Sequence, residues 1–330
     1  MAEATIRDVA RRAQVSIATV SRALNGLENV SEETRVKVGA AVAELGYVPH
    51  AGARSLSLAR AHAIGVVLPD LYGEFFSEIM RGMDREASRH NYLLLLSNLH
   101  AGSSQSEVAV RAMRGRVDGL VVMAPHLDRA ALERVLPAGL PAVLLNTPLD
   151  VGSFASLRLD NAAGVHALVE HLVVTGRRRI VHISGPPENA DSQERRAAFE
   201  QAIARLLPGS EARVVTGDFT EDGGQRIARD LIAGGVDCDA IFAANDMMAT
   251  GCLLALKDCG IAVPERIAVA GFDDIPLARF VGLTTVRVRI AELGEAAIAR
   301  LVGLLDGSGS AAEEYHRPEL VIRATTGPAA

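Results

Sequence analysis

The sequence predicts a small all-α head followed by a larger α/β core. In the first 45 residues, apolar side chains recur at helical spacing between small polar residues. From Ala63 onward, short aliphatic runs alternate with amphipathic stretches of a dozen residues or more, which is typical of parallel strands joined by helices. With 330 residues, 49% of them hydrophobic, the chain is long enough and apolar enough for at least two domains with buried cores.

Three helices are expected in the head, and each has a recognisable start. Thr5 precedes the first helix and can share a capping box with Asp8. Ser16 and Ser31 stand where the caps of the second and third helices are needed, and Gly46 ends the third. The head therefore reads as a compact bundle of short helices.

The segment 47–60 is expected to be a hinge between head and core. Pro49 interrupts the preceding structure, and Gly52 and the short length make a helix here marginal in isolation. We expect this segment to become ordered only under certain conditions.

Eight aliphatic runs and seven amphipathic stretches make up the core. The runs lie at 63–69, 92–97, 119–125, 141–146, 179–186, 212–218, 240–246 and 266–274. The amphipathic stretches lie at 75–90, 104–116, 162–175, 192–206, 222–233, 247–258 and 291–305. Near-continuous apolar strands imply parallel sheet buried on both faces, arranged as one barrel or as two open sheets.

Several of the predicted strands end in polar residues. Pro69-Asp70, Asn245-Asp246 and Asp273-Asp274 follow three of the aliphatic runs. Open parallel sheets bind ligands just beyond the carboxyl ends of their strands. A barrel would use the same ends, so these residues predict a binding site without separating the two architectures.

Charge and composition narrow the function classes. Residues 1–60 carry a net charge of +2 and residues 61–330 a net charge of −8, which fits a head that meets a polyanion. We find no signal peptide and no apolar run of about 18 residues, so we expect a cytoplasmic protein with no membrane partner. The three cysteines lack CxxC spacing and read as free thiols.

The second helix, in "VSIATVSRAL" at 15–24, carries little hydrophobic bulk. Its side chains suit three kinds of contact with DNA: hydroxyls with phosphates, small apolar groups with thymine methyls, and a guanidinium with guanine. These residues are Ser16, Thr19 and Ser21; Ile17 and Ala18; and Arg22. Together with the preceding helix and turn they would form a helix-turn-helix. An ordinary helical hairpin with solvated polar side chains fits the same pattern.

Several motifs make the chain resemble the lactose-repressor (LacI/GalR) family of bacterial transcription regulators. In the head they are "TIRDVARRAQVSIATVSRALNG", "VSEETRVKV" and "AELGYVPH". In the rest of the chain they are "ARSL", "IGVVLPD", "VDGLVV", "RLDN", "ERRAAF", "AIFAAND", "IAVAGFDD" and "TTVRV". The motifs occur in order and span essentially the whole chain.

The resemblance assigns roles in the head and hinge. Ile17, Ala18 and Arg22 match positions that read bases. The residues that match backbone-gripping positions are Thr5, Ser16, Thr19, Ser21 and Asn25. Ala53 and Leu56 match hinge residues that enter the minor groove, where a leucine from each subunit can wedge a base step. The chain departs from the family at Gln14, His50 and Gly52, where Gly, Asn and Ala are usual.

For the core, the resemblance implies two doubly wound parallel-sheet lobes like those of a periplasmic sugar-binding protein, with a small effector between them. Arg195, Asn245 and Asp273 match effector-binding positions, and Phe75 and Phe219 match apolar positions of the pocket wall. We also expect a contribution from Asp160, where the lobes cross over. Taken alone, Arg195 or Asp273 would read as one half of a surface ion pair. Val288 stands where some members have a polar residue.

The resemblance also implies domain boundaries and an assembly. We expect a DNA-binding domain at 1–46, a hinge at 47–60 and a core at 61–330. One lobe would hold about 61–160 and 290–317, and the other about 161–289 and 318–330. A pseudo-palindromic operator requires a homodimer. The apolar stripe of helix 75–90 fits either core packing or the dimer interface, and the missing heptad tail favours a dimer over a tetramer.

The predicted function is a DNA-binding transcriptional regulator, a repressor that binds double-stranded operator DNA and responds to a small effector. The effector is expected to be an inducing sugar or sugar acid, and a purine co-repressor is the alternative. An enzyme is disfavoured because the sequence has no GxSxG, HExxH, P-loop or GxGxxG motif. A sugar-binding module would have no DNA-binding head. We expect no catalytic residue, no metal and no cofactor.

Overall fold

The computed structural model describes residues 4–24, 29–47, 60–98, 110–127, 129–136, 139–147 and 154–327. It divides into two compact units. The head unit ends at Ala63 and includes Met113–Asp118, and the body unit holds the remaining residues. Within the head unit, the Asp118 carboxylate accepts hydrogen bonds from the backbone N–H groups of Ala61 and His62 at 2.6 and 2.7 Å.

The described part of the head has the three helices that the sequence predicts: α1 (Ile6–Ala13), α2 (Ile17–Leu24) and α3 (Glu32–Leu45). Three buried valines hold them together, and Val9, Val20 and Val38 have relative exposures of 0, 0 and 1%. Each predicted start is confirmed: Thr5 and Asp8 form a capping box, and the hydroxyls of Ser16 and Ser31 each accept a backbone N–H three residues on.

Gln14, one of the departures from the family pattern, ends α1 with a left-handed backbone at φ 55°. This conformation costs an L-residue roughly 1–2 kcal/mol, whereas glycine adopts it freely. The chain therefore accepts some strain in the turn between α1 and α2.

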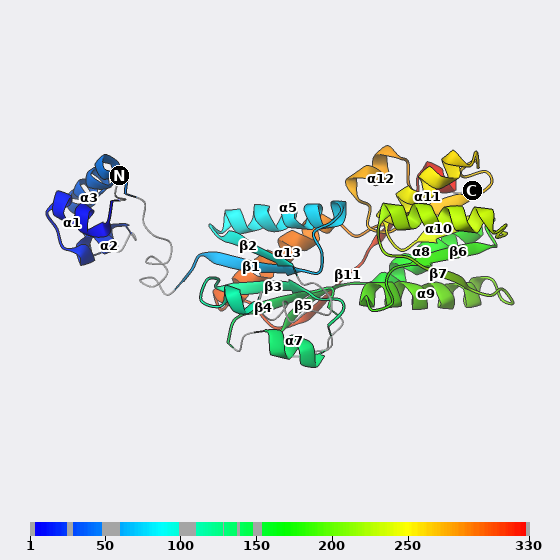
Figure 1. Ribbon diagram of the computed structural model, residues 1–330. Coiled ribbons are helices and arrows are strands. Elements are labelled where there is room, and N and C mark those ends of the chain that lie inside the picture. Colours follow the sequence, from blue (N-terminus) through cyan, green and yellow to red (C-terminus); the bar gives the residue numbers. More distant parts are fainter. Residues whose placement is uncertain are drawn as a thin grey trace. The chain divides into compact units, whose positions relative to one another are not determined.

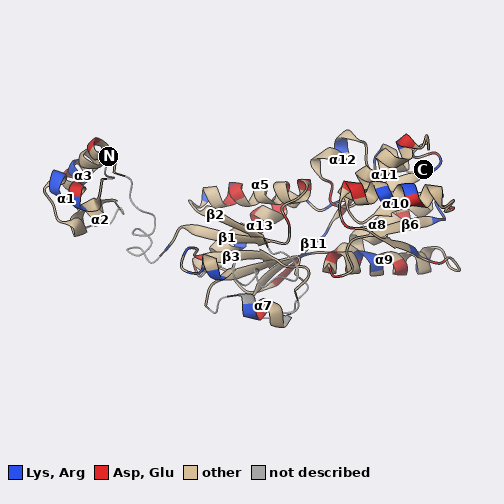
Figure 2. Cartoon of the chain, viewed as in Figure 1, with Lys and Arg blue, Asp and Glu red and all other residues tan. Residues whose placement is uncertain are grey.

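The first of the two main sheets in the body has six strands in the order β11-β5-β4-β3-β1-β2 (Figure 1). Its strands are β1 (Ala63–Leu68), β2 (Leu93–Asn98), β3 (Gly119–Met123), β4 (Ala142–Leu145), β5 (Ala155–Leu159) and β11 (Glu313–His316). β1, β3 and β4 are fully buried and carry no charged residue, as Figure 2 shows for β1 and β3. The helices α5 (Glu74–Arg89) and α13 (Ile290–Leu305) pack on this sheet, and α7 spans Arg129–Val135. We call the sheet and its helices the first lobe.

The second main sheet has four parallel strands in the order β7-β6-β8-β9. They are β6 (Ile180–Ser184), β7 (Arg213–Thr216), β8 (Ala240–Ala243) and β9 (Ala268–Ala270). Of its helices, α9 (Ala190–Leu206) and α11 (Asp246–Asp258) pack on the sheet, α8 (Asn161–Val174) packs beside α9, and α10 (Glu221–Ala233) packs beside α11. The short helix α12 (Pro276–Phe280) follows β9. An antiparallel pair, β10 (Thr285–Arg287) with β12 (Glu319–Val321), lies against α8, and a short 3-10 helix spans Ala324–Thr326. These elements form the second lobe.

The body is therefore built from open sheets and is not a single barrel. Within the described residues, the chain passes between the lobes at 159–161, 287–290 and 316–319. Three short crossings allow the strand ends of both sheets to face a common space.

The stripe of apolar residues on α5 packs partly into the core. Ile79 and Met83 are fully buried, while Phe76 and Met80 are half-buried. The backbones of α5 and α13 touch through two glycines: a Cβ at Gly82 would lie 1.9 Å from the Ala291 oxygen, and one at Gly294 would lie 2.3 Å from the Ile79 oxygen. No larger residue fits at either crossing point.

Strand β2 differs from the expectation of strands buried on both faces. It lies at the edge of the first sheet, and Leu93, Leu95 and Leu96 have relative exposures of 73, 38 and 44%. An apolar run predicts a strand, but only the strand order decides whether that strand is central.

The core of the second lobe contains a buried histidine. The His182 ring packs against those of Phe199 and Phe242, with ring centroids 5.1 and 4.4 Å away, and it is fully buried. Its Nδ1 lies 3.0 Å from the Phe242 carbonyl oxygen, to which the neutral ring can donate. Burial lowers the pKa of His182 from 6.5 to about 3, so the ring is neutral at physiological pH.

In the described parts of the chain, no helix is long and apolar enough to cross a membrane.

Candidate functional site

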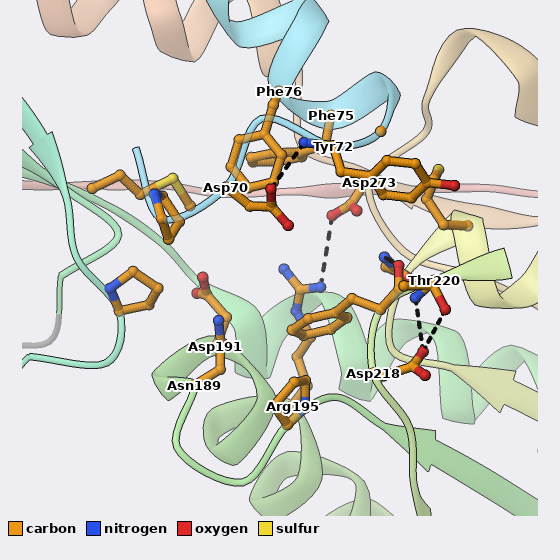
Figure 3. Close-up of a pocket in the computed structure, with 18 residues that line it drawn as sticks. Asp70, Tyr72, Phe75, Phe76, Asn189, Asp191, Arg195, Asp218, Thr220 and Asp273 are labelled. Carbon is orange, nitrogen blue, oxygen red and sulfur yellow. Dashed lines mark hydrogen bonds and ion pairs between the residues drawn. The ribbon is translucent and has the colours of Figure 1, made fainter. Parts of the chain in front are cut away.

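A cavity of about 230 Å³ lies between the lobes in the body (Figure 3). Its walls are the segments that follow β1, β3, β6, β7, β8 and β9, which agrees with the ligand position expected for open parallel sheets. The lining residues are Pro69, Asp70, Tyr72, Gly73, Phe75, Phe76, Met123, Pro125, Pro186, Asn189, Asp191, Arg195, Asp218, Phe219, Thr220, Asn245, Met247 and Asp273.

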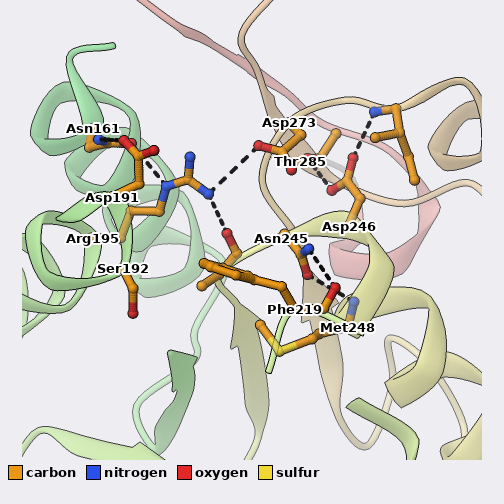
Figure 4. A network of polar contacts seen from close by, with 12 residues as sticks. Asn161, Asp191, Ser192, Arg195, Phe219, Asn245, Asp246, Met248, Asp273 and Thr285 are labelled. Atoms are coloured by element: carbon orange, nitrogen blue, oxygen red, sulfur yellow. Dashed lines mark hydrogen bonds and ion pairs between the residues drawn. The ribbon is translucent and has the colours of Figure 1, made fainter. Parts of the chain in front are cut away.

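Arg195 on α9 is the centre of a buried polar network (Figure 4). Its relative exposure is 4%, and its guanidinium lies 3.8 Å from the centroid of the Phe272 ring. Nε donates to the Asn161 side chain at 2.9 Å, and Nη1 donates to the Ala244 carbonyl at 2.5 Å and lies 3.6 Å from Asp273. Fixed on three sides, the guanidinium has a defined orientation at the cavity wall.

Asp273 lies in a strained loop between β9 and α12. Asp273 and Asp274 have φ values of 113° and 57°, which are unusual for residues other than glycine. Asp246 holds this loop, because its carboxylate accepts from the Ile275 N–H at 2.9 Å and from the Thr285 hydroxyl at 2.5 Å.

The electrostatic environment of Asp273 is set mainly by burial. Burial raises the pKa of Asp273 to about 7, while Arg195 acts in the opposite direction. The pKa of Asp246 is raised well above its usual value by burial and by the neighbouring Asp273. Burial and the neighbouring Arg195 therefore act in opposite directions on the carboxyl group that this loop holds at the cavity.

Asn245 and Phe219 are joined at another part of the cavity wall. The Asn245 side chain caps α11 by accepting from the Met248 N–H, and its Nδ2 donates to the Phe219 carbonyl, both at 3.0 Å. Phe219 has a left-handed backbone at φ 66°. Its ring lies against Gly185, where a Cβ would come within 2.1 Å of the ring. The absence of a side chain at Gly185 is thus what leaves room for the aromatic wall.

The first lobe contributes aromatic rings and one carboxylate. Phe75 and Phe76 meet edge to face with centroids 5.3 Å apart at the start of α5. Asp70 accepts hydrogen bonds from the backbone N–H groups of Leu71 and Tyr72 and so fixes the loop after β1. The Tyr72 hydroxyl donates to Glu221 of the second lobe at 2.9 Å, which links the two walls.

The cavity contains five of the six residues expected to bind effector: Phe75, Arg195, Phe219, Asn245 and Asp273. Asp160 is not among the lining residues, and its side chain caps α8 by accepting from the Ala163 N–H. In the same "RLDN" motif, the neighbouring Asn161 instead bonds both Arg195 and Asp191. The cap requires the Asp160 carboxylate to turn toward the helix, which explains its absence from the wall.

Several lining residues were not anticipated as effector contacts, Asp191, Asp218 and Tyr72 among them. Asp70 had a signal, since it follows a predicted strand. Asp191 had none, because an acidic residue in the first turn of a helix is common for helix-dipole reasons alone.

In the head, α2 presents the side chains expected to read bases. Ile17, Ala18 and Arg22 are exposed, and Val20 between them is buried against the other helices. Thr5 and Ser16 are exposed, and Thr19 and Ser21 are half-buried. The Ser16 and Thr19 hydroxyls lie 2.8 Å apart at the start of α2. Asn25, Ala53 and Leu56 lie outside the described residues, as do His50 and Gly52.

No group of three or more metal-ligating side chains is found among the described residues. The cavity therefore offers hydrogen bonds and aromatic surface.

A helix-turn-helix head joined to a two-lobed body with a polar cleft defines a class: DNA-binding regulators with a periplasmic-binding-protein-like body.

Comparisons with known proteins place the chain within this class. The model of bacterial regulatory proteins of the lacI family matches residues 5–50, and the periplasmic binding protein-like domain matches residues 169–326. The HTH-type transcriptional regulator GalS of Salmonella typhimurium LT2 is 36% identical over 310 residues, which cover 92% of this chain and 91% of GalS. The ribose operon repressor of Escherichia coli K12 is 36% identical over 309 residues, which cover 91% and 92% of the two chains.

A solved structure resembles nearly the whole chain. The Lac repressor dimer bound to operator and the anti-inducer ONPF has a TM-score of 0.88 and 29% identity, with 99% of this chain and 100% of that chain covered. The chain belongs to the lacI family of bacterial regulatory proteins, and it is a DNA-binding transcriptional regulator.

Proposed function

We propose that this protein is a cytoplasmic repressor that binds a pseudo-palindromic operator as a homodimer and is released by a small sugar-like effector bound between the lobes. Residues 1–46 would bind DNA, 47–60 would form the hinge and 61–330 would bind effector and dimerise. We assign the protein no enzymatic activity. The observation that carries the proposal is the convergence of Arg195, Asn245, Asp273, Phe75 and Phe219 on one cavity.

The exposed face of α2 supports sequence-specific DNA reading. Ile17 and Ala18 near the helix start can contact thymine methyls, and Arg22 can bond guanine with two hydrogen bonds. Thr5, Ser16, Thr19 and Ser21 supply hydroxyls for phosphate contacts, together with Asn25. In our proposal Ala53 and Leu56 enter the minor groove.

The composition of the cavity supports binding of a small polyhydroxylated effector. A guanidinium, an amide and a carboxylate fixed on one wall can bond several hydroxyl groups at defined positions. The aromatic rings of Phe75 and Phe219 can cover the faces of a sugar ring. Asp160 caps α8, so its contribution would be to hold that helix in place.

Control by the effector requires different affinities for two states of the dimer, because a ligand that binds both equally shifts nothing. The cross-lobe hydrogen bond between Tyr72 and Glu221 supports a closed state of the cleft. We propose that closure changes the separation of the two hinges and so the affinity for operator. We expect the effector to lower the affinity for operator, so that it acts as an inducer.

Operator selection from random duplexes with the full-length protein, followed by binding titrations, tests the DNA half of the proposal. Arg22→Ala should relax the preference for guanine at one position per half-site, by roughly 1–3 kcal/mol of discrimination. Arg12→Ala is the matched control, because Arg12 pairs with Glu44 at 2.6 Å. An unchanged base preference in Arg22→Ala would refute the assigned role.

The effector half is tested on the same duplex with a panel of sugars, sugar acids and purines. The expected result is that one of the sugars weakens operator binding and raises the melting temperature. Asp273→Ala should lose both responses and keep its operator affinity. If a purine instead tightens operator binding, the protein is co-repressed and not induced. If Asp273→Ala keeps both responses to the sugar, the effector binds elsewhere.

A further inference from the structure

The cavity between the lobes is strongly unbalanced in charge. Its described lining contains four carboxylates, from Asp70, Asp191, Asp218 and Asp273, and one cation, Arg195. Two of the four are engaged elsewhere. Asp70 accepts from backbone N–H groups of its own loop, and Asp218 is paired with Arg226 at 3.2 Å. The charge that a ligand meets is therefore set mainly by Asp191, Arg195 and Asp273.

The charge of Arg195 is already balanced within the protein. Its Nη1 lies 3.6 Å from an Asp273 oxygen, and Asn161 links its Nε to Asp191 through bonds of 2.9 and 2.8 Å. Two carboxylates thus share one guanidinium. An anionic ligand that approached Arg195 would add a third negative charge around a single positive one.

Asp191 is a buried carboxylate with unused hydrogen-bonding capacity. Its relative exposure is 9%, and its Oδ1 accepts from Asn161. Its Oδ2 has no hydrogen-bond partner among the described residues, and Figure 3 shows the side chain directed toward the cavity. Burial raises the pKa of Asp191, and Arg195 and Asn161 counteract this. An acceptor that lines the cavity can be completed by a ligand hydroxyl, which donates a hydrogen bond without adding charge.

The size of the cavity limits the ligand as well. A volume of about 230 Å³ is smaller than the roughly 300–1,000 Å³ typical of sites for drug-sized ligands. The space suits one small ring, and the acceptors Asp191 and Asp273 line it together with aromatic surface.

We propose that Asp191 is a specificity residue that closes the cleft to anionic effectors, so that the effector is an uncharged monosaccharide and not a sugar acid or a sugar phosphate. The inference rests on the proposed function, because it assigns the chemistry of an effector to the same cavity. Hydroxyl groups of the sugar donate to Asp191 and Asp273, and Arg195 donates to a ring or hydroxyl oxygen. In their ionised forms, Asp191 and Asp273 repel a carboxylate or phosphate placed there, because like charges in a cavity of low dielectric repel strongly.

The test is calorimetric titration of the full-length protein with matched pairs of neutral and acidic sugars at pH 8.5, above the pKa of about 7 for Asp273. The pairs, in which both members keep the sugar ring, are galactose with galacturonate, glucose with glucuronate, ribose with ribose 5-phosphate, and glucose with glucose 6-phosphate. In the wild type, at least one neutral sugar should bind about 30-fold more tightly than its acidic counterpart. Asp191→Asn keeps the size of the side chain and removes its charge, and it should reduce that ratio by about tenfold.

Two further variants make the outcome specific to Asp191. Asp191→Ser removes the same charge with a smaller side chain, so it covers the case in which the asparagine variant folds poorly. Glu188→Gln removes a charge from the exposed loop just before α9, outside the cavity lining, and should leave the ratio unchanged.

The outcomes separate this inference from the proposed function. If an acidic sugar binds the wild type as tightly as its neutral counterpart, charge exclusion is wrong and the effector site stands. If the ratio is unchanged in both Asp191 variants, another group sets the selectivity and the role of Asp191 is wrong. If no sugar of any pair binds, the sugar effector of the proposed function is wrong, and this inference with it.

Discussion

The two lobes of the body bury different kinds of polar side chain. In the described part of the first lobe, the buried polar side chains are neutral, and they are Asn146, Thr147 and Ser156. The second lobe buries neutral ones too, but it also buries titratable and charged groups: His171, His182, Asp191, Arg195, Asp239, Asp246 and Asp273. At the cavity, the first lobe supplies mainly aromatic surface and the second supplies the fixed charges.

The two lobes therefore supply different groups to the cavity wall. Buried charges are expensive to desolvate, and they stabilise a fold only when their partners are well placed. In the second lobe, Asp191 and Asp273 lie around Arg195 beside the cavity. The first lobe contributes Phe75 and Phe76 to the cavity wall.

The largest expected effect is that of removing the central cation. Arg195→Met leaves Asp191 and Asp273 buried without their shared partner, and it should destabilise the protein by about 3–5 kcal/mol. Arg196→Met is the matched control, because Arg196 is half exposed and pairs with Glu200 of the same helix, a contact worth about 0.5 kcal/mol. Urea unfolding of both variants provides the measurement. Equal small losses would mean that the network contributes nothing to the stability of the second lobe.

A second prediction concerns acid stability. Because the pKa of His182 is about 3 in the folded protein and 6.5 otherwise, the unfolded chain binds more protons between these values. Stability is therefore lost as pH falls through this window, by about 3 kcal/mol between pH 6.5 and 4. His182→Gln should remove this part of the pH dependence, as unfolding free energies across that range would reveal.

The raised pKa values of Asp191, Asp246 and Asp273 act with the opposite sign, since the folded state then holds the additional protons. The contribution of His182 is therefore read from the difference between the unfolding free energies of the wild type and of His182→Gln at each pH. His90→Gln, at an exposed histidine of the first lobe, is the control. A His182→Gln protein with the same pH profile as the wild type would contradict a buried neutral ring.

The smallest effect is expected at the junction of the two lobes. Tyr72→Phe removes the hydrogen bond to Glu221 and keeps the ring, and because Tyr72 is 59% exposed the loss is modest. Effector affinity should fall by about two- to fivefold. A double-mutant cycle with Glu221→Gln measures the coupling directly. Additive effects of the two changes would show that the bond does not help to hold the lobes closed.

The sequence predicted those features that depend on local pattern. The caps at Thr5, Ser16 and Ser31 and the polar strand ends at Asp70 and Asp273 are properties of short segments, and short segments determine them. The resemblance to a family supplied Arg195, Asn245, Phe75 and Phe219, which composition alone would not have selected.

The features that were missed depend on contacts between distant segments. Whether the β2 leucines are buried depends on strand order, and β2 lies at an edge. Asp191 acquires its surroundings only because α8 packs beside α9 and brings Asn161 next to it. In the "RLDN" motif, Asp160 caps α8, and this leaves Asn161 to bond Arg195. The sequence did not show which of the two side chains would cap the helix.

The glycine contacts between α5 and α13 have a mechanical consequence. With Gly82 against Ala291 and Gly294 against Ile79, the two helices interlock at backbone level and cannot slip past one another. Both helices begin at the cleft end of the first lobe, α5 at Glu74 beside the cavity and α13 just after a crossing between the lobes. Each helix therefore limits how far the other can shift, and a side chain added at either glycine would force the two helices apart.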